Sequence, residues 1–346
     1  MKRLPTACAL LAALCYGISA PVAKLLLARL PPALLAALLY LGAGIGMSIV
    51  NLFRKKREAS LEAKLTKAEL PYAAAMILLD IAAPILLMFG LSMSSPASAS
   101  LLNNFEIVAT ALIALVAFKE AIGRRMWLAI GAITLGSAML SISDFETLTF
   151  SMGSIFVLLA CVSWGIENNC TSKLSLKDPL QIVVIKGFGS GVGALAIALA
   201  TGSSLSSASL VLAALALGFV AYGLSIYFYI LAQRGLGAAR TSAFYAFAPF
   251  VGAGLSFAVF RETPTISFAI ALVVMLAGAC LAAFERHSHS HAHEEMEHEH
   301  RHSHSDGHHN HTHEPPVTGE HSHAHVHAAI VHTHAHAPDM HHAHKH

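Results

Sequence analysis

Residues 97–120 read ASASLLNNFEIVATALIALVAFKE. A helix that crosses a bilayer needs about 20 mainly apolar residues, and this stretch is long and apolar enough. Asn103, Asn104 and Glu106 nevertheless interrupt it near its middle. The stretch therefore predicts a membrane-spanning helix that carries an acid in the apolar part of the bilayer.

A second stretch, residues 239–262, reads ARTSAFYAFAPFVGAGLSFAVFRE and has the same length. It ends on Phe-Arg-Glu, where the first ends on Phe-Lys-Glu. When the two are aligned end to end, Ser100 falls on Ser242, and Glu106 falls on Ala248. The alignment predicts two related halves, of which only the first carries an acid at this position.

The composition is that of an integral membrane protein. Hydrophobic residues make up 55% of the chain and charged residues only 12%, against about 25% charged in an ordinary soluble domain. The cysteines lie in apolar stretches without C-x-x-C spacing, which argues against a disulfide framework or a thiolate zinc site.

Ten segments meet the length and polarity expected of spanning helices. The first also has features of a signal peptide, but its apolar run continues to Leu27, which favours a retained helix. The ten segments lie at residues 4–28, 31–53, 70–92, 97–118, 126–143, 152–172, 180–200, 207–233, 239–260 and 265–284.

The positive charges predict the orientation. With the N-terminus inside, the short outer loops hold only Arg29 and Arg261, and the other loop Lys and Arg residues lie inside. Because inner loops are enriched in Lys and Arg, we expect a multi-pass protein of the cell membrane with both termini in the cytoplasm.

Each half contains five segments, so the second half would enter the membrane inverted. Tyr16-Gly17 near the start of the first half has a counterpart in Trp164-Gly165. Inverted repeats place a substrate path near the bilayer midplane and suit alternating access.

These motifs resemble the EamA-type repeat of the drug/metabolite transporter superfamily. Pro249 stands where that repeat usually has a proline, whereas the first half has Ile107 there. The resemblance assigns a first repeat to residues 1–143 and a second to residues 152–284. It implies an all-α membrane fold of ten helices with a central cavity, and it implies no particular substrate.

Four ionisable side chains lie well inside apolar segments: Asp80, Glu106, Glu167 and Lys186. A charge at the bilayer centre costs at least about 2.5–3.5 kcal/mol, so such groups usually face a cavity or a partner. A buried carboxyl group also takes up a proton more readily than an exposed one. All four are candidates for substrate or proton coupling.

Glu106 is the first candidate. Asn103 precedes it by three residues, so both are expected on one helix face, with Asn104 beside them. An amide and a carboxylate together can bind a proton, a metal cation or an ammonium group. A protonated acid that only bonds a neighbouring helix is the alternative.

Glu167, Asn168 and Asn169 repeat this composition in reverse order. Glu167 and Lys186 lie at matching depths, so we predict that they pair. The pair can be structural or functional, and the same two alternatives stand for Asp80. The glycines at 187, 189, 191 and 193 form two interleaved G-x-x-x-G pairs, which predict close helix packing.

The tail, residues 285–346, holds all 23 histidines, is polar throughout and is expected to be disordered. Neutral imidazole suits Zn, Ni, Co and Cu, and protonation below about pH 6 would release them. The candidate ligands are His287, His289, His291, His293, His298, His300, His302, His304, His308, His309, His311 and His313.

We interpret the chain as a secondary transporter that exports metabolites or drugs, with proton coupling at Glu106 and no required cofactor. One alternative is a divalent transition-metal transporter whose tail collects or senses metal. Another is a metal sensor that transports nothing. No nucleophile–base set suggests an enzyme. The expected partners are the bilayer and a small substrate, with room for a homodimer and no nucleic acid.

Overall fold

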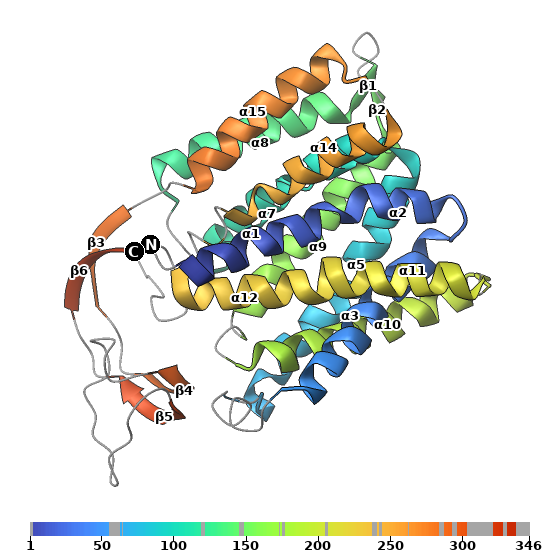
Figure 1. Ribbon diagram of the computed structural model, residues 1–346. Coiled ribbons are helices and arrows are strands. Elements are labelled where there is room, and N and C mark those ends of the chain that lie inside the picture. Colours follow the sequence, from blue (N-terminus) through green and yellow to red (C-terminus); the bar gives the residue numbers. More distant parts are fainter. Residues whose placement is uncertain are drawn as a thin grey trace.

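A computed structural model of the chain is almost entirely helical across the two predicted halves (Figure 1). The structure describes residues 3–54, 63, 65–118, 122–144, 149–172, 174, 177–204, 207–236, 241, 244–261, 263–283, 287–292, 296–302, 321–327 and 331–336. Statements below concern these residues.

The helices agree with the predicted segments within a few residues, apart from the ninth, whose first residues lie mostly outside the description. The first half contains α1 (Arg3–Gly17), α2 (Ser19–Leu27), α3 (Pro32–Leu52), the short η1 (Lys67–Glu69), α5 (Leu70–Met93), α6 (Pro96–Leu102), α7 (Phe105–Phe118) and α8 (Arg124–Ser141). The second contains α9 (Met152–Ser172), α10 (Pro179–Ala200), α11 (Ala208–Gly218), the π-helical η2 (Phe219–Leu224), α12 (Ser225–Leu236), α14 (Ala248–Phe260) and α15 (Ile266–Ala283).

Two short strands, β1 (Ile142–Asp144) and β2 (Thr149–Phe150), pair in the antiparallel sense between the halves. Six helical stretches are long and apolar enough to cross a membrane: Leu4–Leu27, Pro32–Leu52, Leu70–Met93, Pro96–Ala117, Pro179–Ala200 and Ala208–Ala232. The helices Ala248–Phe260 and Ile266–Ala282 are apolar but shorter. The chain is therefore a multi-pass membrane protein.

The stretch around Glu106 is not one continuous helix. The side chain of Asn104 donates to the carbonyl of Leu101 at 3.2 Å, and Asn amides of this kind compete with the helical backbone ladder. The amide N–H groups of Asn103 and Asn104 bond three residues back, to Ser100 and Leu101. The helix consequently divides into α6 and α7 at the two asparagines.

Glycines set how closely α3 packs. A Cβ at Gly187 would lie 2.4 Å from the Gly44 nitrogen, and one at Gly42 would lie 2.1 Å from the Leu215 oxygen. Only glycine permits such backbone approach, so α3 lies directly against α10 and α11. The two interleaved G-x-x-x-G pairs contact different helices. Gly187 and Gly191 face α3, and Gly189 and Gly193 face α5.

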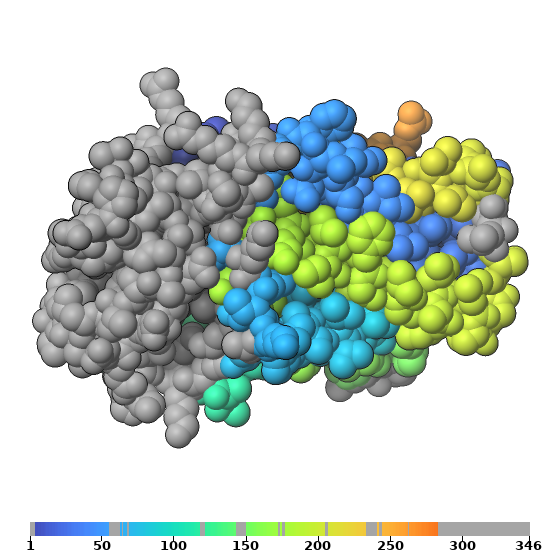
Figure 2. All heavy atoms as spheres, turned by 90° about the horizontal axis from the view of Figure 1, so that it is seen from below, coloured from blue at the N-terminus to red at the C-terminus, as the bar shows by residue number. Residues whose placement is uncertain are grey.

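A polar latch, which we define as Arg54, Glu69, Lys177 and Asp178, joins the two halves where α3 ends and α10 begins. Arg54 Nη1 lies 2.6 Å from Asp178 Oδ2, and Lys177 Nζ lies 3.2 Å from Glu69 Oε1. Figure 2 shows the ends of α3 and α10 and the start of α5 beside one another on this face. The latch holds these ends together.

The tail contains four strands: β3 (His287–Ala292), β4 (Met296–His302), β5 (His321–His327) and β6 (Val331–His336). Antiparallel pairs form between β3 and β6 and between β4 and β5. This differs from the predicted disorder. His-x-His spacing also has the two-residue repeat of a strand, which the sequence interpretation did not count.

Candidate functional site

Three charged side chains from three helices meet in the protein core. Lys186 Nζ on α10 lies 2.9 Å from Asp80 Oδ2 on α5 and 3.1 Å from Glu167 Oε1 on α9. All three residues are buried, with exposed fractions of 0% for Asp80, 1% for Glu167 and 6% for Lys186. The predicted Glu167–Lys186 pair is confirmed. Asp80, for which the sequence offered no partner, completes what we call the acid–lysine cluster.

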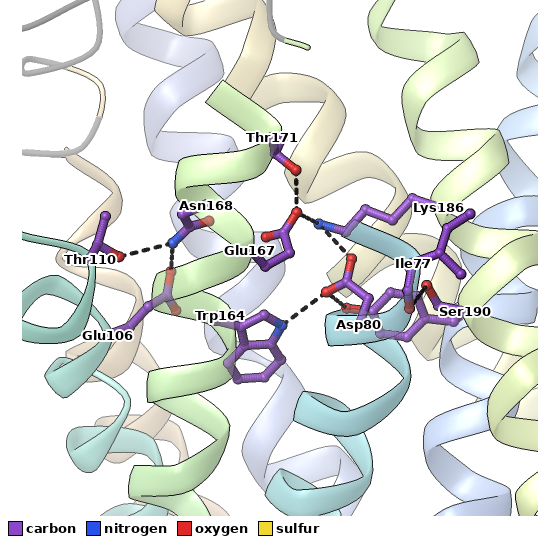
Figure 3. Close-up of polar contacts among 11 residues, drawn as sticks. Ile77, Asp80, Glu106, Thr110, Trp164, Glu167, Asn168, Thr171, Lys186 and Ser190 are labelled. Atoms are coloured by element: carbon purple, nitrogen blue, oxygen red, sulfur yellow. Dashed lines mark hydrogen bonds and ion pairs between the residues drawn. The ribbon is translucent and has the colours of Figure 1, made fainter. Parts of the chain in front are cut away.

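Neutral donors fix the two acids of the cluster (Figure 3). The Tyr40 hydroxyl on α3 donates to Asp80 Oδ1 at 2.9 Å, and the Trp164 indole N–H on α9 donates to the same oxygen at 3.2 Å. Thr171, one turn after Glu167, donates to Glu167 Oε1. These donors hold the carboxyl oxygens in place beside the ammonium group.

Pro84 frees the backbone at Asp80. Proline has no N–H, so the helical bond that Pro84 would otherwise donate to the Asp80 carbonyl cannot form. The helix α5 nevertheless runs through it from Leu70 to Met93. The acid thus lies where Pro84 interrupts the backbone ladder of α5.

Glu106 occupies a separate site on the other side of α9. Asn168 Nδ2 donates to Glu106 Oε1 at 2.6 Å and lies 3.3 Å from Thr110 Oγ1. Glu106, Asn168 and Thr110 are each only partly buried. No Lys or Arg of the described residues forms an ion pair with Glu106. Glu167 and Asn168 are neighbours in the chain but face different sites (Figure 3).

The predicted grouping of Asn103 with Glu106 stays a prediction. The break after α6 turns Asn103 toward α9, where Cys161 Sγ lies 3.9 Å from its Oδ1. Asn104 is buried and bonds within its own turn. Asn169 donates to the carbonyls of Gly165 and Thr110 and so helps hold α9 to α7. The amide that meets Glu106 is that of Asn168.

A chain of tyrosines extends from the acid–lysine cluster. Tyr222 in η2 packs on Tyr40 with ring centroids 5.2 Å apart, and Tyr16 follows at 5.9 Å from Tyr222. Tyr245 lies 5.7 Å from Tyr16, and Tyr229 lies 4.9 Å from Tyr245. Of these tyrosines, the sequence singled out only Tyr16, through its Tyr-Gly motif.

A small cavity lies at the helix breaks. Its polar lining comes from Tyr16 and Ser19 at the α1–α2 junction and from Ser100 and Asn103 at the end of α6, and Pro249 of α14 closes it. Pro21 withholds the backbone N–H that would bond the Gly17 carbonyl, which explains the irregular α1–α2 junction. The cavity lies where residues 97–120 of the first half meet residues 239–262 of the second.

The described residues contain no group of three or more His, Cys, Asp or Glu that could hold a metal ion. Of the predicted tail ligands, His287, His289 and His291 lie in β3, and His298, His300 and His302 lie in β4. The remaining six predicted ligands, His293, His304, His308, His309, His311 and His313, lie outside the described residues. Metal binding by the tail stays a prediction.

Buried charge between helices with membrane-spanning character is typical of transport proteins. Two copies of the family model for the EamA-like transporter family match the chain, at residues 4–142 and 151–284. The protein belongs to this family of membrane transporters.

Two further comparisons agree. An uncharacterized transporter of Methanothermobacter thermautotrophicus is 28% identical over 282 residues, which cover 76% of this chain and 81% of the relative. A solved crystal structure superposes with a TM-score of 0.60 at 19% identity, over 80% of this chain and 95% of that one. The first similarity supports the transporter class, and the second supports the fold alone.

Proposed function

We propose that the protein is a secondary transporter that exports small metabolites or drugs across the cell membrane by alternating access. Protons are coupled to transport at Glu106. One observation carries this proposal. Glu106 is a partly accessible carboxyl group in a membrane helix, and no basic side chain of the described residues neutralises it. Such a group exchanges a proton or meets a substrate.

The helix pairs support two inverted repeats of five spanning helices. The second, fourth and fifth predicted helices pack on their own counterparts in the other half, as α3 with α10, α6 with α14, and α8 with α15. The first packs on the eighth (α1 with α12), and the third packs on the sixth (α5 with α9). A two-fold relation between the halves produces this set of pairs. In this proposal both termini lie on the cytoplasmic side.

The polar latch and the Glu106 site have different roles in this proposal. The latch joins the halves at the predicted cytoplasmic end, so it must part when the path opens inward. The Glu106 site joins α7 of the first half to α9 of the second. A change of protonation at Glu106 alters its bond with Asn168, and that bond links the two halves.

The test uses a deletion strain that carries the full-length protein, Glu106→Gln, or a Lys67→Gln control, because Lys67 is exposed and lies outside both the latch and the Glu106 site. Growth is measured against a panel of toxic organic compounds and against Ni, Zn, Co and Cu, together with cell metal content. We expect protection against organic compounds by the full-length protein and by Lys67→Gln, and its loss in Glu106→Gln. Protection that survives in Glu106→Gln would exclude coupling at this residue.

The metal alternative rests on the histidine tail. A protein truncated after residue 286 distinguishes the metal alternative from the exporter proposal. A metal phenotype that the truncation removes would favour a metal transporter with a collecting tail. Metal binding without any change in metal content or tolerance would favour the sensor. Protection against organic compounds by the truncation would leave the exporter as the function and make the tail accessory.

A further inference from the structure

We propose that the acid–lysine cluster is a binding site for one exchangeable proton. Ionised Asp80 and Glu167 carry two negative charges, and Lys186 supplies one positive charge. The buried cluster therefore has a net charge of −1. An uncompensated charge away from water costs several kcal/mol, and one proton removes it.

The groups around the cluster do not supply a second positive charge. Tyr40 reaches it from α3, Trp164 and Cys170 from α9, and Tyr222 from η2, while Glu106 acts on it from α7. These are phenols, an indole, a thiol and a further acid. Among the described residues Lys186 is the basic side chain that pairs with the two acids.

Buried hydroxyls offer a route to the cluster from the cavity. Ser19 lines the cavity, and its hydroxyl interacts with the buried hydroxyl of Tyr222. Buried hydroxyls in native proteins usually bond to one another or to water. The Tyr222 ring packs on Tyr40, which donates to Asp80. Ser19, Tyr222 and Tyr40 thus lead from the cavity to the acid.

Protonation would change how the halves are joined. Asp80 belongs to the first half, and Glu167 and Lys186 belong to the second. A proton on either acid ends its ionic bond with Lys186 and leaves the ammonium group with a single partner. Coupling of this step to transport rests on the proposed function. Proton binding itself does not, and it is measured without any substrate.

Trp164 supplies a built-in reporter. The chain has two tryptophans, and Trp127 is 49% exposed whereas Trp164 is 6% exposed and donates to Asp80. In a Trp127→Phe protein, emission comes from Trp164 alone. We expect its emission in lipid nanodiscs to show one transition between about pH 5 and 9, with the slope of a single proton.

Three variants in this background test the assignment. Asp80→Asn should remove the transition. Glu167→Gln should move it to more acidic pH, because Asp80 and Lys186 then form a neutral pair. Glu106→Gln removes only a more distant negative charge, so it should shift the transition slightly to more acidic pH without removing it. All variants carry the same tail, so any contribution of its histidines cancels in the comparison. Size-exclusion chromatography first checks that each variant is folded. If Asp80→Asn does not fold, Tyr40→Phe replaces it, and this variant should also move the transition.

An emission that does not change over this pH range would overturn the proposal. So would a transition that persists unchanged in Asp80→Asn and Glu167→Gln, or one that only Glu106→Gln removes. Loss of transport in Glu106→Gln together with a flat Trp164 titration would refute the proton site and leave the transporter proposal standing. Transport that survives in Glu106→Gln, together with a Trp164 transition that Asp80→Asn removes, would refute coupling at Glu106 and support the proton site.

Discussion

The hydroxyl of Ser100 donates a 2.9 Å hydrogen bond to the carbonyl of Pro249. The two residues belong to the equivalent stretches of the two halves, and they meet where α6 ends and α14 begins. Gly252 makes this crossing possible, since a Cβ there would lie 2.2 Å from Ser100 Oγ and 2.8 Å from the Gly17 oxygen. Three helices therefore converge at Gly252 with no room for a Cβ there.

We expect Gly252→Ala to destabilise the protein by about 1–3 kcal/mol, because overpacking forces backbone shifts. Thermal unfolding of the purified protein in detergent measures the effect. Gly254→Ala is the matched control, since a Cβ there meets nothing within 4 Å. Ser100→Ala combined with Gly252→Ala should recover only part of the loss, because the Gly17 carbonyl still obstructs. Equal stability of the two single glycine variants would contradict the close crossing.

The sequence predicted the helices well and their breaks poorly. Apolar runs between prolines and charges define where a spanning helix starts and stops, so segments such as 180–200 agree with α10 at Pro179–Ala200. The same apolar run continues through Asn103 and Asn104, and hydrophobicity does not register a side chain that bonds its own backbone. The division into α6 and α7 was therefore missed.

Contacts between side chains on different helices were predictable only for residues at the same depth in the membrane on successive helices. Glu167 and Lys186 lie on successive helices at equal depth, and their pairing was confirmed. Asp80 joins them because α5 packs beside both α9 and α10, which helix order does not reveal. For the same reason the sequence did not reveal that Asn168, on another helix, donates to Glu106.

Lys186→Met should destabilise the protein by about 3–5 kcal/mol, the usual cost of leaving a buried charge without its partner. Two carboxylates would then share the core without a cation. Adding Glu167→Gln removes one of them, so the double variant should be more stable than Lys186→Met alone. Chemical unfolding in detergent micelles measures both. A double variant that is less stable than the single one would show that charge balance does not govern this cluster.

Glu69 should make the polar latch sensitive to acid. Burial raises its pKa, but hydrogen bonds from the Thr66 hydroxyl and backbone N–H and from Lys177 outweigh burial and hold the pKa below its usual range. A lowered pKa stabilises the fold at pH values above the unfolded-state value. That contribution is lost as pH falls through the folded-state pKa.

The measurement is the difference in unfolding temperature between the native protein and Glu69→Gln. We expect a positive difference at pH 7 that shrinks steadily below about pH 4.5. Lys67→Gln, in the same short helix, is the control, because Lys67 is exposed. A difference that stays constant from neutral to acid pH would mean that the Glu69 charge does not stabilise the latch.

The histidine tail should bind Ni²⁺ or Zn²⁺ independently of the membrane helices. Neutral imidazoles are good ligands for these ions, and protonation removes the lone pair that binds them. Equilibrium dialysis of the full-length protein should therefore show bound metal at pH 7.5 that is released below about pH 6. A protein truncated after residue 286 lacks all 23 histidines and should bind far less. Equal binding by both proteins would place the metal among the membrane helices instead.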